Sequence, residues 1–133
     1  MAIALDHAIV PIRGRKAAAR LLAEILDVPW AESGIGPFSP VYVSDDLTLD
    51  FDEAEGEFPT LHYCFRVDDP TFDQIVARLI ARGIEYRSTP HGPSDMRVNT
   101  SHGGKIVYWS MPEGHIWEAL TVSYERRASS GGT

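Results

Sequence analysis

Residues 61–84 of the chain read LHYCFRVDDPTFDQIVARLIARGI, and this stretch decides the fold because a strand pattern runs directly into a helix pattern. Up to residue 67, apolar and polar side chains alternate, as in a strand with one face against a core. From residue 72, apolar side chains recur at i, i+3, i+4, i+7 and i+8, the spacing of an amphipathic helix. We expect Asp69 to cap this helix, Pro70 to be its first residue and Gly83 to be the left-handed residue that ends it.

The same helix pattern occurs earlier in the chain at a constant offset of 54 residues, from Ala18 to Leu26. Each helix is preceded by one predicted strand and followed by a short strand and then a hairpin. The first set of strands is 3–10, 28–32, 38–44 and 47–52, and the second is 60–67, 84–88, 104–110 and 115–122. This order predicts a β-α-β-β-β module written twice.

The predicted fold class is α+β, with two βαβββ modules in one domain of residues 1–124, because neither module can cover its own sheet. Module 1 covers about residues 1–53 and module 2 about 60–124. Residues 125–133 are predicted to form a flexible tail, since they contain little to bury.

The composition excludes several kinds of partner. The 133 residues include 12 Lys and Arg against 19 Asp and Glu, a formal net charge of −7. No basic cluster of the kind that binds phosphate backbones is present, so nucleic acid is not an expected partner. No apolar run reaches the roughly 20 residues of a membrane span, and the start lacks a secretory signal pattern. The single cysteine, Cys64, rules out an internal disulfide, and we expect a cytoplasmic protein.

Strand alternation selects the candidate site residues. Asp50 and His62 lie on the faces opposite the apolar side chains of their strands, away from the predicted helices. His7 and His62 open their strands at equivalent points of the repeat, 55 residues apart, and Asp50 and Glu118 occupy equivalent places in the last strands. Two imidazoles with one or two carboxylates form a recognised donor set for a first-row divalent metal. Each of these residues could instead be a satisfied buried polar group or part of a turn.

Three stretches resemble the vicinal oxygen chelate superfamily, which includes glyoxalase I, bleomycin-resistance proteins, fosfomycin-resistance enzymes and extradiol dioxygenases. They are LDHAIV at 5–10, the stretch at 61–84, and GGKIVYWSMPEGHIWEAL at 103–120. The resemblance implies the glyoxalase/bleomycin-resistance/dioxygenase fold, a curved mixed sheet around a cavity. It also implies a homodimer, with the cavity formed within one chain or by modules from two chains.

The resemblance also implies roles for individual residues. His7, His62 and Glu118 match the family's metal ligands. Asp50 falls near a fourth ligand position, where it would be a ligand or an outer partner. His115 matches a residue that shapes its turn.

The function predicted from these residues is that of a divalent-metal-dependent enzyme acting on a small vicinal-oxygen substrate, as an isomerase, lyase or dioxygenase. The metal could be Fe, Zn, Ni, Mn or Mg. His102 and Tyr108 are the candidate catalytic residues, and the loop histidine His91 is a weaker candidate.

Two alternatives involve no metal. The first is a small-molecule-binding protein of the bleomycin-resistance type. Its cavity walls would be Trp30, Phe38, Trp109 and Trp117. The second is a regulatory or interaction domain without chemistry.

Overall fold

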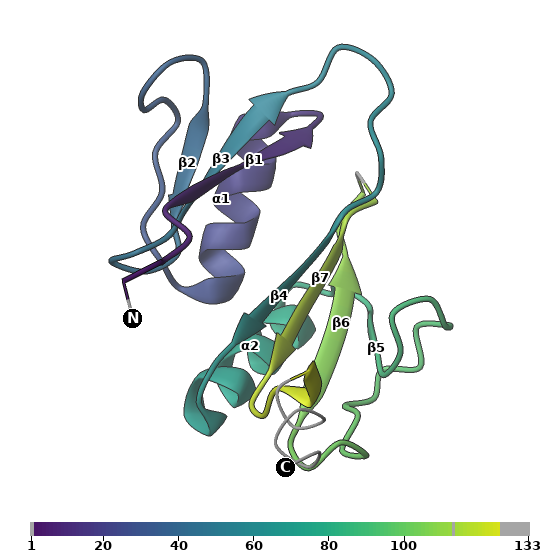
Figure 1. The fold of residues 1–133 in the computed structure, drawn as a ribbon. Helices are drawn as coiled ribbons and strands as arrows, with labels where there is room; N and C mark the ends of the chain where they lie inside the picture. Colours follow the sequence, from purple (N-terminus) through teal and green to yellow (C-terminus); the bar gives the residue numbers. More distant parts are fainter. Residues whose placement is uncertain (1, 113, 126–133) are drawn as a thin grey trace. The chain divides into compact units, whose positions relative to one another are not determined.

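Two sheets, each with one helix lying along one of its faces, make up the structure (Figure 1). It is a computed structural model, and it describes residues 2–112 and 114–125. The chain divides into two compact units between Pro59 and Thr60. The predicted α+β fold class is confirmed. The predicted tail lies outside the described residues apart from Glu125, and no helix among those residues is long and apolar enough to cross a membrane.

The first unit has a three-stranded mixed sheet in the order β1-β3-β2. Strand β1 is parallel to β3, and β2 is antiparallel to β3. The helix buries the apolar stripe that the sequence predicted, with Leu22 and Ile25 completely inaccessible. The elements are β1 (His7–Ile12), α1 (Arg15–Leu26), β2 (Ser39–Tyr42) and β3 (Thr48–Glu53).

Two strand predictions in this unit were wrong. The first strand begins at His7 rather than at residue 3, because its partner strand begins at Thr48, opposite His7. Ile3 and Leu5 therefore precede the sheet, and they are 83% and 66% exposed. The strand predicted at 28–32 is a single bridge between Trp30 and Val41.

The start of α1 is capped by Glu53, the last residue of β3, which lies opposite Ile12 at the end of β1. Gly14 precedes the helix in the left-handed conformation (φ 67°), and no local side chain caps it. Instead, the backbone N–H groups of Gly14 and Arg15 donate to the two carboxylate oxygens of Glu53, at 2.8 and 2.9 Å. These hydrogen bonds, from Arg15 first and then Gly14, lower the pKa of Glu53.

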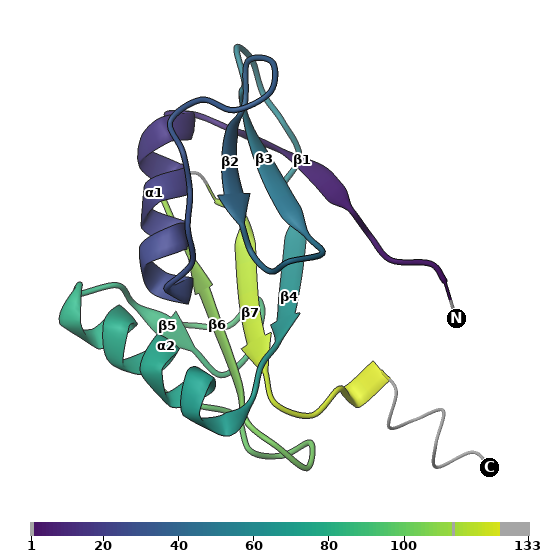
Figure 2. The ribbon, with the colours of Figure 1, turned by 90° about the vertical axis from the view of Figure 1, so that its left-hand side faces the viewer.

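The second unit has a four-stranded sheet in the order β4-β7-β6-β5. Strand β4 is parallel to β7, while β6 is antiparallel to both β7 and β5. Helix α2 lies along one face, which Figure 2 shows from the side. The elements are β4 (His62–Arg66), α2 (Asp69–Ala81), β5 (Tyr86–Arg87), β6 (Ile106–Ser110) and β7 (Ile116–Leu120).

The ends of α2 are close to the predicted ones, with one correction. Asp68, not Asp69, is the cap, because Asp68 is extended and its carboxylate accepts a hydrogen bond from the Thr71 N–H at 2.9 Å. Asp69 is then the first helical residue and Pro70 the second. Gly83 is left-handed (φ 67°), as predicted.

The register of the second sheet separates its two faces. Tyr63, Trp117, Trp109 and Tyr86 are aligned across the four strands on one face. Trp109 and Trp117 are completely buried there, and Trp117 stacks on Tyr63 with ring centroids 4.8 Å apart. These two tryptophans are core residues, so the prediction that they form walls of a ligand cavity is wrong. We call the opposite face, with His62, Cys64, Tyr108 and Glu118, the open face.

Candidate active site

The open face of the second unit holds a histidine–glutamate pair. Strands β4 and β7 run parallel with Cys64 opposite Glu118, which places His62 and Glu118 on one face and two positions apart. His62 Nε2 lies 2.7 Å from Glu118 Oε1. The Glu118 side chain is fully buried, whereas that of His62 is 39% exposed. The pair therefore joins a sequestered carboxylate to an imidazole that reaches the surface.

Three more polar side chains surround Glu118. The Tyr124 hydroxyl donates to Glu118 Oε1 at 3.1 Å. Loss of water around the Cys64 thiol, and then the negative charge of Glu118, raise the pKa of Cys64 to about 12. Burial first, and then the charge of Glu118, raise the pKa of Tyr108 to about 12. Both groups therefore keep their protons at neutral pH and can act as hydrogen-bond donors beside the carboxylate.

The second oxygen of Glu118 lacks a partner. Oε2 is buried, and nothing within residues 2–112 and 114–125 forms a hydrogen bond with it. On the same face of the sheet, the side chains of Ile106, Tyr108, Ile116 and Leu120 form a buried cluster. Burying a carboxylate oxygen unpaired is costly unless a proton or a cation compensates it. This oxygen is therefore a natural ligand atom for a cation.

A cavity of about 560 Å³ opens beside the pair. His62, Cys64 and Glu118 form part of its lining, and Tyr124 borders it from the segment after β7. Its volume is within the range of small-molecule sites. The open face thus combines a cavity, a buried carboxylate and an accessible imidazole.

The first unit carries the corresponding residues in a more exposed setting. His7 opens β1, and Asp50 lies on β3 opposite Ile9. His7 Nδ1 lies 2.8 Å from the carboxylate of its neighbour Asp6, and both side chains are largely exposed. The hydrogen bond with Asp6 and the charge of Asp6 raise the pKa of His7, and the charge of Asp50 adds to this effect. His7, Asp50 and Phe38 border a cavity of about 360 Å³.

Each unit thus brings together one predicted imidazole and one predicted carboxylate, His7 with Asp50 and His62 with Glu118. In the described part of the chain, no three His, Cys, Asp or Glu side chains form a cluster able to hold a metal ion. The structure confirms the strand face that sequence alternation predicted for Asp50. Leu49 and Phe51 are buried, whereas Asp50 between them is half-buried and faces the other way.

The remaining predicted residues lie as follows. Tyr108 is on the open face, directly opposite Glu118 on the neighbouring strand. His102 is exposed, and its ring centroid is 6.0 Å from that of Tyr124. His115 is fully buried and accepts a hydrogen bond at Nδ1 from the Leu61 N–H at 3.0 Å, as expected of a residue that shapes its turn. His91 is exposed in the loop after β5.

Two residues beside the His62–Glu118 pair, Cys64 and Tyr124, were not predicted from the sequence. Cys64 could have been found, because strand parity places it on the same face as His62. Tyr124 follows the last strand, and its hydrogen bond to Glu118 depends on how the chain turns back after Leu120. No periodic pattern carries that information.

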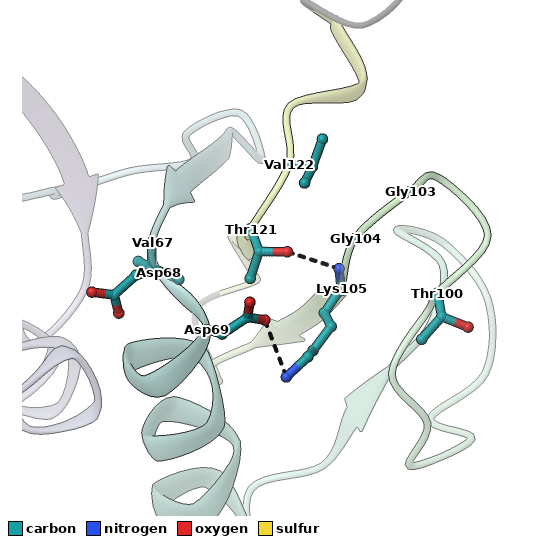
Figure 3. Close-up of a pocket in the computed structure, with 9 residues that line it drawn as sticks. All are labelled: Val67, Asp68, Asp69, Thr100, Gly103, Gly104, Lys105, Thr121 and Val122. Carbon is teal, nitrogen blue, oxygen red and sulfur yellow. Dashed lines mark hydrogen bonds and ion pairs between the residues drawn. The ribbon is translucent and has the colours of Figure 1, made fainter.

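A further cavity of about 620 Å³ lies at the start of α2 and contains none of the predicted site residues (Figure 3). Its only lysine, Lys105, is ion-paired with Asp69 at 3.2 Å and with Asp73 at 2.9 Å. These carboxylates raise the pKa of Lys105, Asp73 more than Asp69. The backbone N–H of Lys105 also donates a hydrogen bond to the Thr121 hydroxyl oxygen. Because Lys105 already pairs with Asp69 and Asp73, its charge is compensated within the chain, and we assign no ligand to this cavity.

Comparison with known proteins places the chain in a superfamily. No protein-family model matches it, and no curated protein does. Among solved structures, one described as oxidase ChaP-H1 is 41% identical, with a TM-score of 0.85 over 92% of this chain and 98% of that chain. Oxidase ChaP-H2 is 35% identical, with a TM-score of 0.86 over 93% and 97%. The fosfomycin resistance protein FosX from Mesorhizobium loti shares the fold at 18% identity, with a TM-score of 0.69 over 96% and 99%.

The fold and these relatives define a class of proteins with paired βαβββ modules. The chain belongs to the vicinal oxygen chelate superfamily, as the resemblance in the sequence predicted. Enzymes of this superfamily are among its structural neighbours, which supports an enzymatic activity in broad terms.

Proposed function

We propose that the protein is a divalent-metal-dependent enzyme of the vicinal oxygen chelate superfamily that acts on a small vicinal-oxygen substrate. The observation that carries this proposal is the His62–Glu118 pair, with donor atoms 2.7 Å apart and one buried carboxylate oxygen unpaired. Two donors bound side by side to one ion, each at about 2.0–2.2 Å, lie about 3 Å from each other. The spacing and the unpaired oxygen both fit a shared cation.

In this proposal His62 and Glu118 are two ligands and His7 is the third. Asp50 is a fourth ligand or an outer partner. Two imidazoles and a carboxylate suit Fe, Zn, Ni or Mn and leave coordination positions for substrate oxygens. The bound ion would supply a Lewis acid to two neighbouring oxygens of the substrate.

The chain's own residues would position the substrate and hold protons. The Tyr108 hydroxyl stays protonated next to Glu118 and can donate a hydrogen bond to a substrate oxygen on the open face. Tyr124 holds the Glu118 carboxylate in place from the side of the cavity. His102, whose ring centroid lies 6.0 Å from that of Tyr124, would accept or return a proton.

The relatives favour one reaction type. The two relatives above 30% identity are both described as oxidases, whereas the fosfomycin resistance protein is far more distant. We therefore place an oxidative reaction of the dioxygenase or oxidase type ahead of an isomerase or lyase reaction. We further propose a cytoplasmic homodimer, in which His7 reaches the site from the same chain or from the second copy.

Metal analysis tests the proposal. Protein purified without a histidine tag and reconstituted separately with Fe²⁺, Zn²⁺, Ni²⁺, Mn²⁺ and Mg²⁺ is expected to retain about one ion per chain after desalting. The His62→Ala variant is expected to lose that ion. Glu55→Gln, which changes an exposed acid in the connector between the units, is the control and is expected to keep it. A parent protein that retains none of these ions would contradict the proposal and favour a binding or regulatory domain.

A further inference from the structure

Arg87 lies in the same row of the sheet as the proposed ligand Glu118. It is the last residue of β5 and pairs with Tyr108 on β6, which in turn pairs with Glu118 on β7. Residues paired in this way point to the same face of a sheet, so Arg87 belongs to the open face. Neighbouring strands are about 4.8 Å apart, which places the Arg87 backbone about 10 Å from that of Glu118.

The Arg87 guanidinium is held rigidly but is only partly used. Nε and Nη2 donate to the Pro90 carbonyl oxygen at 3.1 and 2.9 Å, and Nη2 also donates to the Ser110 hydroxyl at 3.0 Å. Among the residues that the structure describes, Nη1 has no hydrogen-bond acceptor, and no carboxylate is within ion-pair distance of Arg87.

The guanidinium borders its own cavity of about 440 Å³. The polar side chains that line it are those of Thr60, Arg87, His91 and Ser110, and the described lining contains no carboxylate. Gly92 and Gly114 also line it. Ile116, which pairs with His62 in the sheet, connects this cavity to the row that holds the proposed metal ligand.

We propose that Arg87 is the binding site for a carboxylate group on the substrate, on the open face and about two strands away from the His62–Glu118 pair. This identification of the ligand as the substrate rests on the proposed function, whereas carboxylate binding at Arg87 does not. A guanidinium carries a single positive charge, which balances the charge of a monoanion, and its free Nη1 can donate a charge-assisted hydrogen bond. The cavity offers no lysine, so a phosphate dianion would be poorly compensated.

The test follows backbone amide NMR signals of the metal-free protein during titration with benzoate and with its neutral counterpart, benzamide. Benzoate is expected to cause saturable shifts at Ser110, Gly92 and Gly114, and benzamide is not. Arg87→Gln is expected to weaken benzoate binding at least tenfold, as loss of a hydrogen bond to a charged group does. Arg97→Gln, which removes an exposed arginine on the following loop, is the control and is expected to bind as the parent does.

Several outcomes would overturn the proposal. These are equal binding of benzoate and benzamide, no saturable shift in the parent, or a dissociation constant unchanged in Arg87→Gln. Tighter binding of inorganic phosphate than of benzoate would contradict the carboxylate assignment. If Arg87→Gln does not fold, Arg87→Lys keeps the charge but loses the fork, and it is expected to bind benzoate more weakly than the parent. Because no metal is present, failure here and failure of the metal experiment are separate results.

Discussion

The two units place a histidine and a carboxylate in the same positions of the repeat, yet the two pairs differ in their surroundings. Each histidine is the first residue of the first strand of its unit. The carboxylate lies on the last strand, opposite the residue that follows the histidine by two positions: Asp50 is opposite Ile9, and Glu118 is opposite Cys64. Glu118 is fully buried and contacts His62, whereas Asp50 is half-buried and His7 pairs with its neighbour Asp6. The repeated topology therefore places one histidine and one carboxylate in equivalent positions of each unit. Burial and side-chain length decide in which unit the two groups are already in contact.

The comparison is tested most strongly by removing one charge from each pair. Glu118→Gln keeps the shape of the side chain but is expected to weaken metal binding by about 100-fold or more, since even outer partners of metal ligands contribute about 10- to 100-fold. Asp50→Asn is expected to weaken it less, by about tenfold, the lower end of the range for outer partners. Competition with a chelating dye measures both affinities, and unchanged circular dichroism verifies folding. Equal losses in the two variants would show that the units contribute alike.

A second test concerns the hydroxyl that holds the buried carboxylate. Tyr124→Phe removes the hydrogen bond to Glu118 Oε1 and is expected to lower metal affinity by about tenfold, because the ligand becomes less well oriented. Tyr63→Phe removes a hydroxyl from the opposite, core-facing side of the same sheet and serves as the matched control. The same dye competition applies. If the metal affinity is unchanged in Tyr124→Phe, the Tyr124 hydroxyl does not help to orient Glu118.

A third test uses the two helix caps, which are long-range in the first unit and local in the second. Glu53→Gln is expected to lower the free energy of unfolding by about 1 kcal/mol, in the range of N-cap losses. Asp68→Asn is expected to cost less, because Asn is itself a good cap residue. Urea denaturation at pH 7 measures both. A larger effect at Asp68 would reverse the expected order.

The pH dependence of the Glu53 cap follows from the direction of its pKa shift. Hydrogen bonds from Arg15 and Gly14 lower the pKa of Glu53 in the folded protein from its ordinary value of 4.5. The stabilisation is complete above that value and is lost as the pH falls from there through the lower folded-state pKa. The difference in unfolding free energy between the parent and Glu53→Gln should therefore shrink between pH 5 and the acid limit of folding. A constant difference would contradict a charged cap.

Strand alternation carried most of the site prediction, because a period of two fixes the face of every residue once the strand is located. It placed Asp50 and His62 away from the cores and put Glu118 in its equivalent position. It could not locate the start of β1, because strand ends depend on the partner: β3 supplies nothing opposite Ile3 and Leu5. Contacts between distant segments, such as that of Glu53 with Gly14, leave no local pattern and were not foreseen.

The thiol beside the carboxylate has a consequence for the durability of the protein. Because the pKa of Cys64 is raised to about 12, its side chain stays a thiol at neutral pH, and the thiolate is the form that peroxides and alkylating agents attack. Loss of water around the Cys64 thiol, and then the negative charge of Glu118, therefore keep the reactivity of Cys64 toward these reagents low.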